Sequence, residues 1–343
     1  MFGRLKDLIR ATLLLTVLVA QSVSAQTQPL RIFHVMSFDS PWRWTDGQFA
    51  GFKEGLGVVD AEYKVFQMDI KRYTSSEDKA ERGRLARDII DTWKPALVYL
   101  SDDAAIEHVA AHYVTSPLPF VFSGANKTLE EHALSGRPNL TGVLEREHFV
   151  ESIRLLRNMV PGVKRIAVIS DPAPHFKPVI DRIHAGMAKL EGVDLVRVDV
   201  LERYSEFQAR VKAYEQEADA VVYLGIFNFK DDQGQPVPYE VVQRWVVENS
   251  RLPEVSFWID RIHFGVLGSV TVSEREQGIA AGKLARAILV DGVKPAALPV
   301  EPTVKGRPAI NLARARGLGI TVQSSELLSA EVVTDFQWTR TPK

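Results

Sequence analysis

Short apolar runs alternate with amphipathic stretches along the chain after residue 30. Each run has the length of a buried β-strand, and the apolar residues between the runs recur with helical spacing. The predicted strands are Arg31–Ser37, Tyr63–Ile70, Ala96–Leu100 and Pro119–Ser123, and the predicted helices are Asp46–Leu56, Ser76–Trp93 and Asp103–Tyr113. Thr45 is the expected cap of the first helix and Gly57 its expected stop. This order is typical of a parallel sheet with helices on both faces.

The same pattern starts again after the turn-rich segment Gly136–Glu145, which lacks helical spacing. The second set has predicted helices at Glu147–Met159, Lys177–Leu190, Ser205–Glu217 and Tyr239–Asn249, and predicted strands at Arg165–Ser170, Asp194–Leu201, Ala220–Ile226, Glu254–Ile259 and Val266–Val272. A last long helix, Glu274–Val290, contains Gly278 and Gly282, which indicate close backbone packing. The sequence therefore predicts an α/β fold with two open lobes and a ligand cleft between them.

The N-terminus has the pattern of a secretory signal peptide. Basic residues precede the apolar run Ala11–Ala20, and small residues at Val23 and Ala25 predict cleavage after Ala25. The alternative is a membrane anchor, but ten apolar residues are too few to span a bilayer of ~30 Å. We therefore expect residues 1–25 to be removed and the protein to be exported to the periplasm.

Composition and motifs argue against several classes of partner and of catalytic site. The 343 residues carry a formal net charge of −1, so no overall field favours nucleic acid or an anionic membrane. The chain has no cysteine, which excludes disulfides, thiol nucleophiles and thiolate metal sites. No Walker A, G-x-S-x-G or H-E-x-x-H motif is present, and we expect no cofactor and no metal.

Polar and aromatic residues follow the predicted strands, where open α/β folds bind their ligands. In the first lobe these candidates are Ser37, Trp42, Trp44, Ser101, Asp102, Asp103, Ser123 and Asn126. Two alternatives stay open: Asp102 or Asp103 could instead cap the next helix, and the tryptophans could pack the lobes together.

The candidates in the second lobe are Asp171, His175, Phe227, Asn228, Trp258 and Asp260. Asp171 could simply begin a proline turn, Asn228 could serve a turn, and Trp258 could belong to the core. Aromatic faces together with carboxylates suit a small ligand that has a planar or apolar part and a cationic part.

Several segments in this order resemble the type I periplasmic substrate-binding proteins of ABC transporters, within the branch of tryptophan- and tyrosine-type binding proteins. They are "GFKEGLG", "KPALVYLSDDAA", "LPFVFSGAN", "PNLTGVLE", "PGVKRIAVISD", "LPEVSFWID", "EQGIAAGKLARAILVDG" and "INLARARGLGI". The resemblance implies two Rossmann-like lobes with parallel sheets, a hinge of about three strands and closure on a small ligand. It also implies a first lobe of residues 30–143 plus about 273–300, and a second of 144–272 plus about 301–335.

The leading hypothesis is a periplasmic solute-binding protein that captures a small molecule, such as an amino acid or an aromatic or amine compound, and delivers it to an ABC permease. The alternative is a periplasmic sensory protein that signals to a membrane kinase or cyclase. An exported enzyme would have to use Asp102, Asp103 and His175 as acids and bases, without a recognisable nucleophile. A DNA-binding regulator would need a helix-turn-helix where the signal peptide stands. We expect a monomer that binds no nucleic acid.

Overall fold

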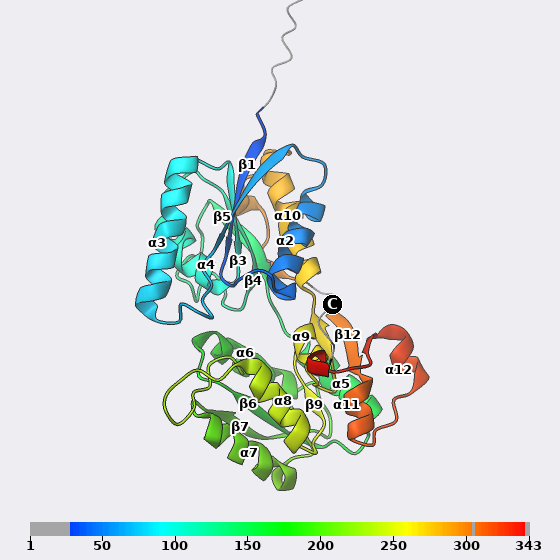
Figure 1. Cartoon of the computed structure of the whole chain (residues 1–343). Helices are drawn as coiled ribbons and strands as arrows, with labels where there is room; N and C mark the ends of the chain where they lie inside the picture. The colour runs from blue at the N-terminus through cyan, green and yellow to red at the C-terminus, as the bar shows by residue number, and fades with distance from the viewer. Residues whose placement is uncertain (1–27, 304–305, 340–343) are drawn as a thin grey trace, which may run out of the picture.

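The computed structural model describes residues 28–303 and 306–339, apart from the side chain of His175. Figure 1 shows two lobes joined along one side. The predicted signal peptide, residues 1–25, lies outside the described residues. In the part of the chain that is described, no helix is both long and apolar enough to cross a membrane.

The first lobe is built on a six-stranded sheet in the order β11-β5-β4-β3-β1-β2, in which every pair of neighbours runs parallel. Its strands are β1 (Leu30–Met36), β2 (Ala61–Gln67), β3 (Leu97–Ser101), β4 (Phe120–Ala125), β5 (Leu140–Leu144) and β11 (Glu301–Pro302). Successive residues of a strand enter different cores: Val98 packs in one and Tyr99 in the other. The sheet is therefore buried on both faces, as the apolar runs predicted.

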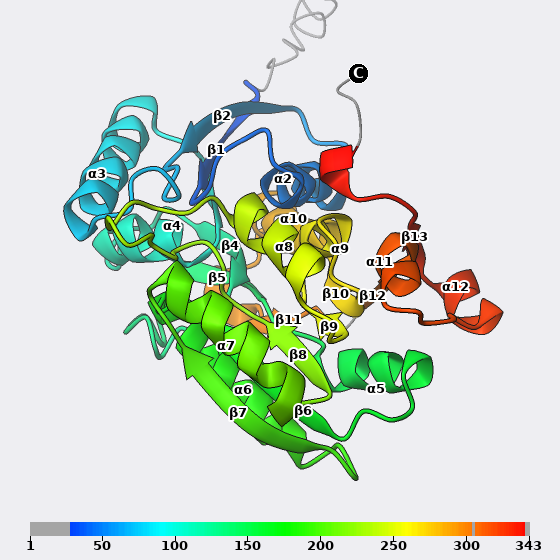
Figure 2. The same ribbon diagram turned by 60° about the horizontal axis from the view of Figure 1, so that its bottom comes forward.

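Two pairs of helices cover this sheet. One face packs against α3 (Ser76–Trp93) and α4 (Asp103–His108), which the short helix η1 (Ala110–His112) follows. The other face packs against α2 (Arg43–Leu56) and α10 (Glu274–Leu289), two helices that lie side by side (Figure 2). Although far apart in sequence, α2 and α10 thus share one core.

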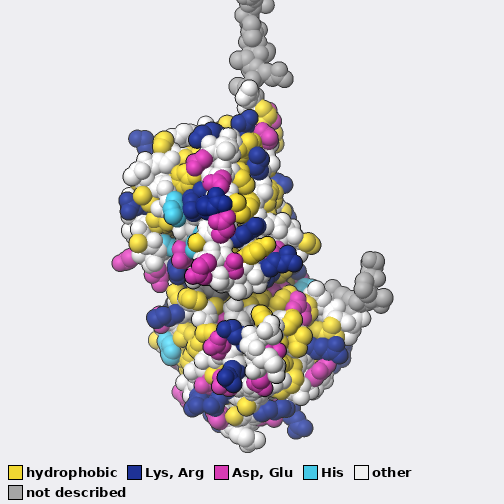
Figure 3. All heavy atoms as spheres, turned by 60° about the vertical axis from the view of Figure 1, so that its left-hand side comes forward, with side chains coloured by type: hydrophobic (Ala, Val, Ile, Leu, Met, Phe, Trp, Pro, Cys, Tyr) yellow, Lys and Arg dark blue, Asp and Glu magenta, His cyan; other side chains and the backbone are white. Residues whose placement is uncertain are grey.

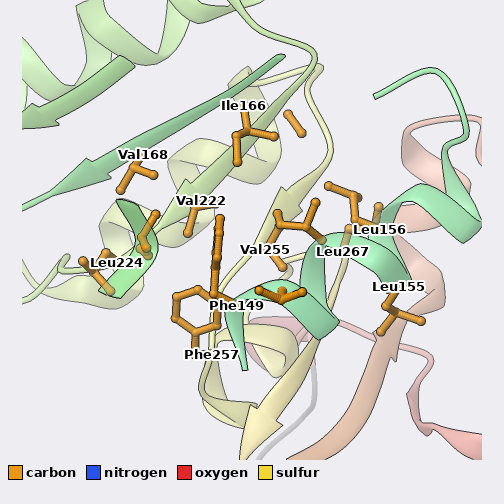
Figure 4. Packing of buried hydrophobic residues seen from close by; sticks show 14 of the residues in the cluster. Phe149, Leu155, Leu156, Ile166, Val168, Val222, Leu224, Val255, Phe257 and Leu267 are labelled. Atoms are coloured by element: carbon orange, nitrogen blue, oxygen red, sulfur yellow. The ribbon is translucent and has the colours of Figure 1, made fainter. Parts of the chain in front are cut away.

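The second lobe repeats this arrangement around a four-stranded parallel sheet in the order β7-β6-β8-β9. Its strands are β6 (Arg165–Ser170), β7 (Asp194–Val200), β8 (Ala220–Tyr223) and β9 (Glu254–Val255), and its helices are α5 (Phe149–Met159), η2 (Pro174–Phe176), α6 (Lys177–Met187), α7 (Tyr204–Glu217), α8 (Tyr239–Asn249) and α9 (Ile259–His263). The core under α5 and α6 includes Phe149 and Phe257, whose rings meet edge to face with centroids 6.4 Å apart (Figure 4). The expected α/β fold with parallel sheets is confirmed.

A third, three-stranded sheet of order β10-β12-β13 extends the second lobe. Its strands are β10 (Gly268–Val272), β12 (Gly306–Asn311) and β13 (Glu331–Val333), and η3 (Pro295–Ala297), α11 (Leu312–Gly317), α12 (Ser324–Ser329) and η4 (Gln337–Thr339) complete the chain. The membership of the strands in the three sheets requires the chain to pass between the lobes after β5, after β10 and after β11. The pairing of β11 with β5 places Glu301–Pro302 in the first sheet. The lobe boundaries expected from the sequence stay a prediction.

The start of α2 differs from the expectation. The helix begins at Arg43, so Trp44 lies within it rather than on a loop, and Thr45 is a buried helical residue rather than the cap. The physical reason is Asp46, whose Oδ2 accepts a hydrogen bond from the backbone N–H of Trp42 at 3.0 Å. That contact satisfies a terminal donor from inside the helix, in the manner of a capping box. Gly57 ends the helix as expected.

Three strands also differ from their expected form. The turn-rich segment Gly136–Glu145 contains the buried strand β5, which glycine and asparagine obscured in the sequence. The expected strand Glu254–Ile259 is reduced to the two residues of β9, because α9 begins at Ile259. β10 does not join the parallel sheet but pairs antiparallel with β12.

We expect Gly278→Ala to lower the free energy of unfolding by ~1–3 kcal/mol, because overpacking costs about that much. A Cβ at Gly278 would lie 2.0 Å from the carbonyl oxygen of Gln48, and backbone cannot rotate away. Urea denaturation measures the loss. The matched control is Gly317→Ala in α11, where a Cβ meets nothing within 4 Å among the described atoms and no loss is expected. Equal stability of wild type and Gly278→Ala contradicts the prediction.

Candidate functional site

A cavity of about 330 Å³ lies between the two lobes, in the size range of small-molecule sites. In the space-filling view a constriction separates the lobes, and hydrophobic side chains lie along it (Figure 3). The predicted site residues that line the cavity are Trp42, Trp44, Asp102, Asp103, Asn126, Phe227, Trp258 and Asp260. The structure thus brings residues of both predicted groups to one cavity.

Asp102 is the buried carboxylate at the end of β3. Its Oδ1 accepts a hydrogen bond of 2.8 Å from the indole N–H of Trp44, and Gln48 Nε2 lies 3.4 Å from Oδ2. Burial raises the pKa of Asp102 to about 8, because the low-dielectric surroundings penalise its charged form more than these donors stabilise it. A cationic group in the cavity would stabilise the charged form of the Asp102 carboxyl group.

The backbone of Asp102 is also unusual. Its φ of 69° and ψ of 167° lie in a region that is essentially reserved for glycine. Gly124 on β4 makes room for the side chain, since a Cβ there would lie 2.6 Å from Asp102 Oδ1. Ser123 donates to Gln48 Oε1 at 2.5 Å and so fixes the amide that faces Asp102. Strain of this kind persists only where the surroundings over-determine it, and it concentrates at functional sites.

Glu145 is a second buried carboxylate in the cavity wall, directly after β5. It accepts a hydrogen bond of 2.7 Å from the indole N–H of Trp258, while Asn126 Nδ2 lies 3.5 Å from its other oxygen. Burial raises the pKa of Glu145 well above its ordinary value, and the nearby carboxylates of Glu147 and Asp102 add to the effect. Two indoles from different elements thus each hold one carboxylate at the cavity.

Aromatic rings form the apolar part of the wall. The ring of Trp42 meets Phe38 edge to face at 5.2 Å and Phe227 of the second lobe at 6.3 Å. The ammonium of Lys71 lies 3.5 Å from the centroid of the Trp42 ring and forms an ion pair with Asp39. The indole nitrogen of Trp42 has no hydrogen-bond partner among the described residues. This nitrogen is a free donor next to the cavity.

The chain matches the family model for ABC transporter substrate binding proteins over residues 44–334. The chain belongs to this family. The resemblance noted from the sequence and the assignment as a solute-binding protein are confirmed. No curated protein matches the sequence.

Solved structures show the same fold as this substrate-binding protein. One is the ABC domain from Streptococcus pneumoniae in complex with L-Trp, with a TM-score of 0.67, 22% identity and coverage of 89% of this chain and 100% of that one. Another is the ligand-free, open form of a substrate-binding protein with adhesive properties from Clostridium difficile, with a TM-score of 0.66, 15% identity and coverage of 89% and 99%. A complex of the TorS sensor domain with TorT gives a TM-score of 0.54 at 15% identity, with coverage of 90% and 98%. At these identities the likeness establishes the fold.

Five other predicted residues lie outside the cavity lining: Ser37, Ser101, Ser123, Asp171 and Asn228. Ser37, and not either aspartate, caps α4: its Oγ accepts from Ala105 N at 2.9 Å. Ser101 pairs with His34, and Ser123 with Gln48. His175 has no described side chain.

Two of the predicted residues hold loops next to the ends of strands, one in each lobe. Asp171 accepts hydrogen bonds from the backbone N–H groups of Ala173, Phe227 and Asn228 at 2.9–3.0 Å, and from the side chain of Asn228 at 3.2 Å. Asp171 is therefore more than the start of a proline turn, because it positions Phe227 at the cavity. Asp103 acts similarly in the first lobe, where it accepts from the backbone of Asn126 and Lys127 and from His132.

Sequence reasoning missed Glu145 and Arg261, which both line the cavity of the substrate-binding protein. Glu145 is the last residue of the segment that was predicted to be a turn, and Arg261 lies beside Asp260 in the largely apolar run "FWIDRIHF". A lone arginine in such a run was the available signal. Within residues 28–303 and 306–339, no three His, Cys, Asp or Glu side chains are placed to hold a metal ion.

We expect Asp102→Asn to gain stability relative to wild type as the pH rises. The pKa of Asp102 is about 8 in the folded protein and 3.8 ordinarily, so between these values the folded state binds more protons than the unfolded chain. The wild-type free energy of unfolding therefore falls with pH in this window, by up to ~1.4 kcal/mol per unit from this group. Asparagine does not titrate, and its side chain has nearly the size and shape of that of aspartate.

Urea denaturation at pH 5 and pH 8 measures the difference between Asp102→Asn and wild type. Asp88→Asn, which removes an exposed carboxylate from α3, is the matched control and should follow wild type at both values. A difference between Asp102→Asn and wild type that is the same at pH 5 and pH 8 contradicts the expectation.

Proposed function

We propose that this substrate-binding protein is exported to the periplasm, where it captures a small solute in the interlobe cavity and delivers it, as a monomer, to an ABC permease. The observation that carries the proposal is the cavity itself, in which two buried carboxylates face aromatic rings from both lobes. Family membership supports the transport role. Closure of the lobes around the solute is the signal that a permease reads.

The chemistry of the wall defines part of the solute. The carboxylates of Asp102 and Glu145 have no cationic side chain bonded to them among the described residues, so a cationic group of the solute is their natural partner. The faces of Trp42 and Trp258 suit an apolar or aromatic body, and aromatic faces also attract cations. An amine attached to such a body fits both parts. The L-Trp in the streptococcal structure is a solute of this kind.

A second partner is also supported. The fold likeness to a complex of TorS with TorT supports a sensory role, in which the closed form docks on a membrane sensor instead of a permease. Both roles require the same solute-binding step, and they differ only in the membrane protein that binds the closed form.

We expect a thermal-shift screen of the purified protein against amino acids, aromatic amines, nucleosides and sugars to find a stabilising solute. A ligand at 100 times its dissociation constant stabilises the folded state by ~2.7 kcal/mol. Trp42→Ala and Asp102→Ala should each abolish the shift, because they remove a ring face and a carboxylate from the cavity. Small-angle scattering should show a smaller radius of gyration with the solute bound.

The matched control for this screen is Asp88→Ala, which removes a carboxylate from the exposed face of α3 and should leave the shift unchanged. A solute that stabilises Trp42→Ala and Asp102→Ala as much as wild type would bind elsewhere and would place the site outside the cavity.

A further inference from the structure

Arg261 is a buried arginine with free hydrogen-bond donors. It lies on α9, lines the cavity and is 1% exposed. Across residues 28–303 and 306–339, neither Nε nor Nη1 has an acceptor within hydrogen-bonding distance. Since burying a charge without its hydrogen bonds is costly, such a group in a cavity wall indicates a ligand that supplies the acceptors.

A second buried arginine shows what a structural guanidinium looks like in this chain. Arg314 is 3% exposed, and each of its three nitrogens donates to a protein acceptor. Nε donates to Glu254 at 2.9 Å, Nη1 to the carbonyl of Val247 at 3.0 Å, and Nη2 to the carbonyl of Ser250 at 2.9 Å. Arg261 is buried to the same degree without such partners, so burial in the fold does not account for it.

Aromatic rings hold the guanidinium of Arg261 without using its N–H groups. Its central carbon lies 4.3 Å from the ring centroid of Phe227, 5.6 Å from that of Tyr239 and 5.9 Å from that of Trp258. Ring faces stabilise a cation electrostatically but are no substitute for carboxylate or carbonyl oxygens. The rings therefore orient the group and leave its Nε and Nη1 without a protein acceptor among the described residues.

Neighbouring carboxylates balance the charge of Arg261 without taking its donors. Burial lowers the pKa of Arg261, and the charges of Asp260, Asp171 and Glu240 act against that shift. Asp171 is occupied by the backbone of Phe227 and Asn228, and Asp260 Oδ2 has no hydrogen-bond partner in the described part of the chain. The guanidinium thus stays charged beside acids that do not bind it.

We propose that Arg261 binds a carboxylate group of the solute, and that the solute is a zwitterion whose cationic end faces Asp102 and Glu145. This inference rests on the proposed function, because it assigns a second subsite in the same cavity. It also assigns the two charged ends to different lobes, since Arg261 belongs to α9 and Asp102 follows β3.

The surroundings favour a carboxylate over a phosphate. The planar guanidinium matches both groups in geometry. The rest of the wall, however, carries more acidic than basic side chains, so it repels a dianion more strongly than a monoanion. The acidic ones are Asp102, Asp103, Glu107, Glu145 and Asp260, and the basic ones besides Arg261 are Lys79 and Lys127. The single guanidinium of Arg261 pairs with one negative charge. The second charge of a phosphate dianion would find no further cationic partner at Arg261.

The test uses matched series of probes in isothermal titration calorimetry with the purified protein. Each series contains a zwitterion, its methyl ester and its decarboxylated amine, built on phenylalanine, tryptophan, leucine and lysine, and glycine betaine is compared with choline. We expect the bound zwitterion to exceed its ester and amine in affinity by about 10- to 100-fold, the value of a charged hydrogen-bonded contact. Arg261→Gln should reduce this preference to less than about threefold.

Two further variants keep the result interpretable. Arg261→Met retains the stacking length and should lose the preference in the same way, so a folding defect of Arg261→Gln alone leaves the test intact. Arg251→Gln removes an exposed arginine of the same lobe and should leave the preference unchanged. The circular dichroism spectrum and melting temperature of each variant report on its fold.

The other outcomes overturn the assignment. Esters or amines that bind as tightly as their zwitterions, or a preference that survives in both Arg261 variants, show that Arg261 binds no carboxylate while solute binding itself stands. Binding of a nucleoside or sugar and of no zwitterion has the same meaning. Failure of every probe class in every assay contradicts both this assignment and the proposed function.

Discussion

The close approach of α2 and α10 is the constraint on which the binding cavity depends. Glycines let the two helices touch through their backbones, and a Cβ at Gly282 would lie 2.1 Å from the carbonyl oxygen of Phe52. The same α2 carries Trp44 and Gln48, whose N–H groups face the carboxylate of Asp102. A displacement of α2 would remove both donors from a carboxylate that burial already penalises. The glycines between α2 and α10 therefore also help to hold the donors that face the Asp102 carboxyl group in the site.

The alternation of apolar runs and amphipathic stretches predicted the two parallel sheets because strands buried on both faces are apolar along their whole length. The prediction from this alternation was wrong for strands that are not apolar along their whole length. β5 is short and contains Thr141 and Gly142, so it reads as a turn, although all its residues are buried. β10 was expected as one more strand of the second set but lies in an antiparallel sheet, and the partner of a strand depends on contacts that its own sequence does not encode.

The site could be predicted in part, since the ends of parallel strands converge on the cavity. The rule does not say which way a side chain turns, because free backbone N–H groups at strand ends compete for polar side chains. Asp171 and Ser37 turned to such groups, whereas Asp102 met an indole and faces the cavity. Arg261 escaped prediction because burial without a partner is a property of three-dimensional packing. Residues of the same type at the ends of parallel strands can therefore either bond the backbone, as Ser37 and Asp171 do, or face the cavity, as Asp102 does.

The contacts between the lobes indicate why a solute can control closure. At the surface Arg43 of α2 binds Glu331 of β13 at 3.1 Å, in a half-exposed ion pair of the kind that contributes ~0–1 kcal/mol. Inside the cavity Trp258 donates to Glu145, and Trp42 meets Phe227 edge to face. None of these contacts supplies a cation to the acidic wall or an acceptor to Arg261. A ligand shifts an equilibrium only by its differential affinity for the two states, and the acidic groups of Asp102 and Glu145 together with the guanidinium of Arg261 offer such a difference to a solute that bonds them in the closed form.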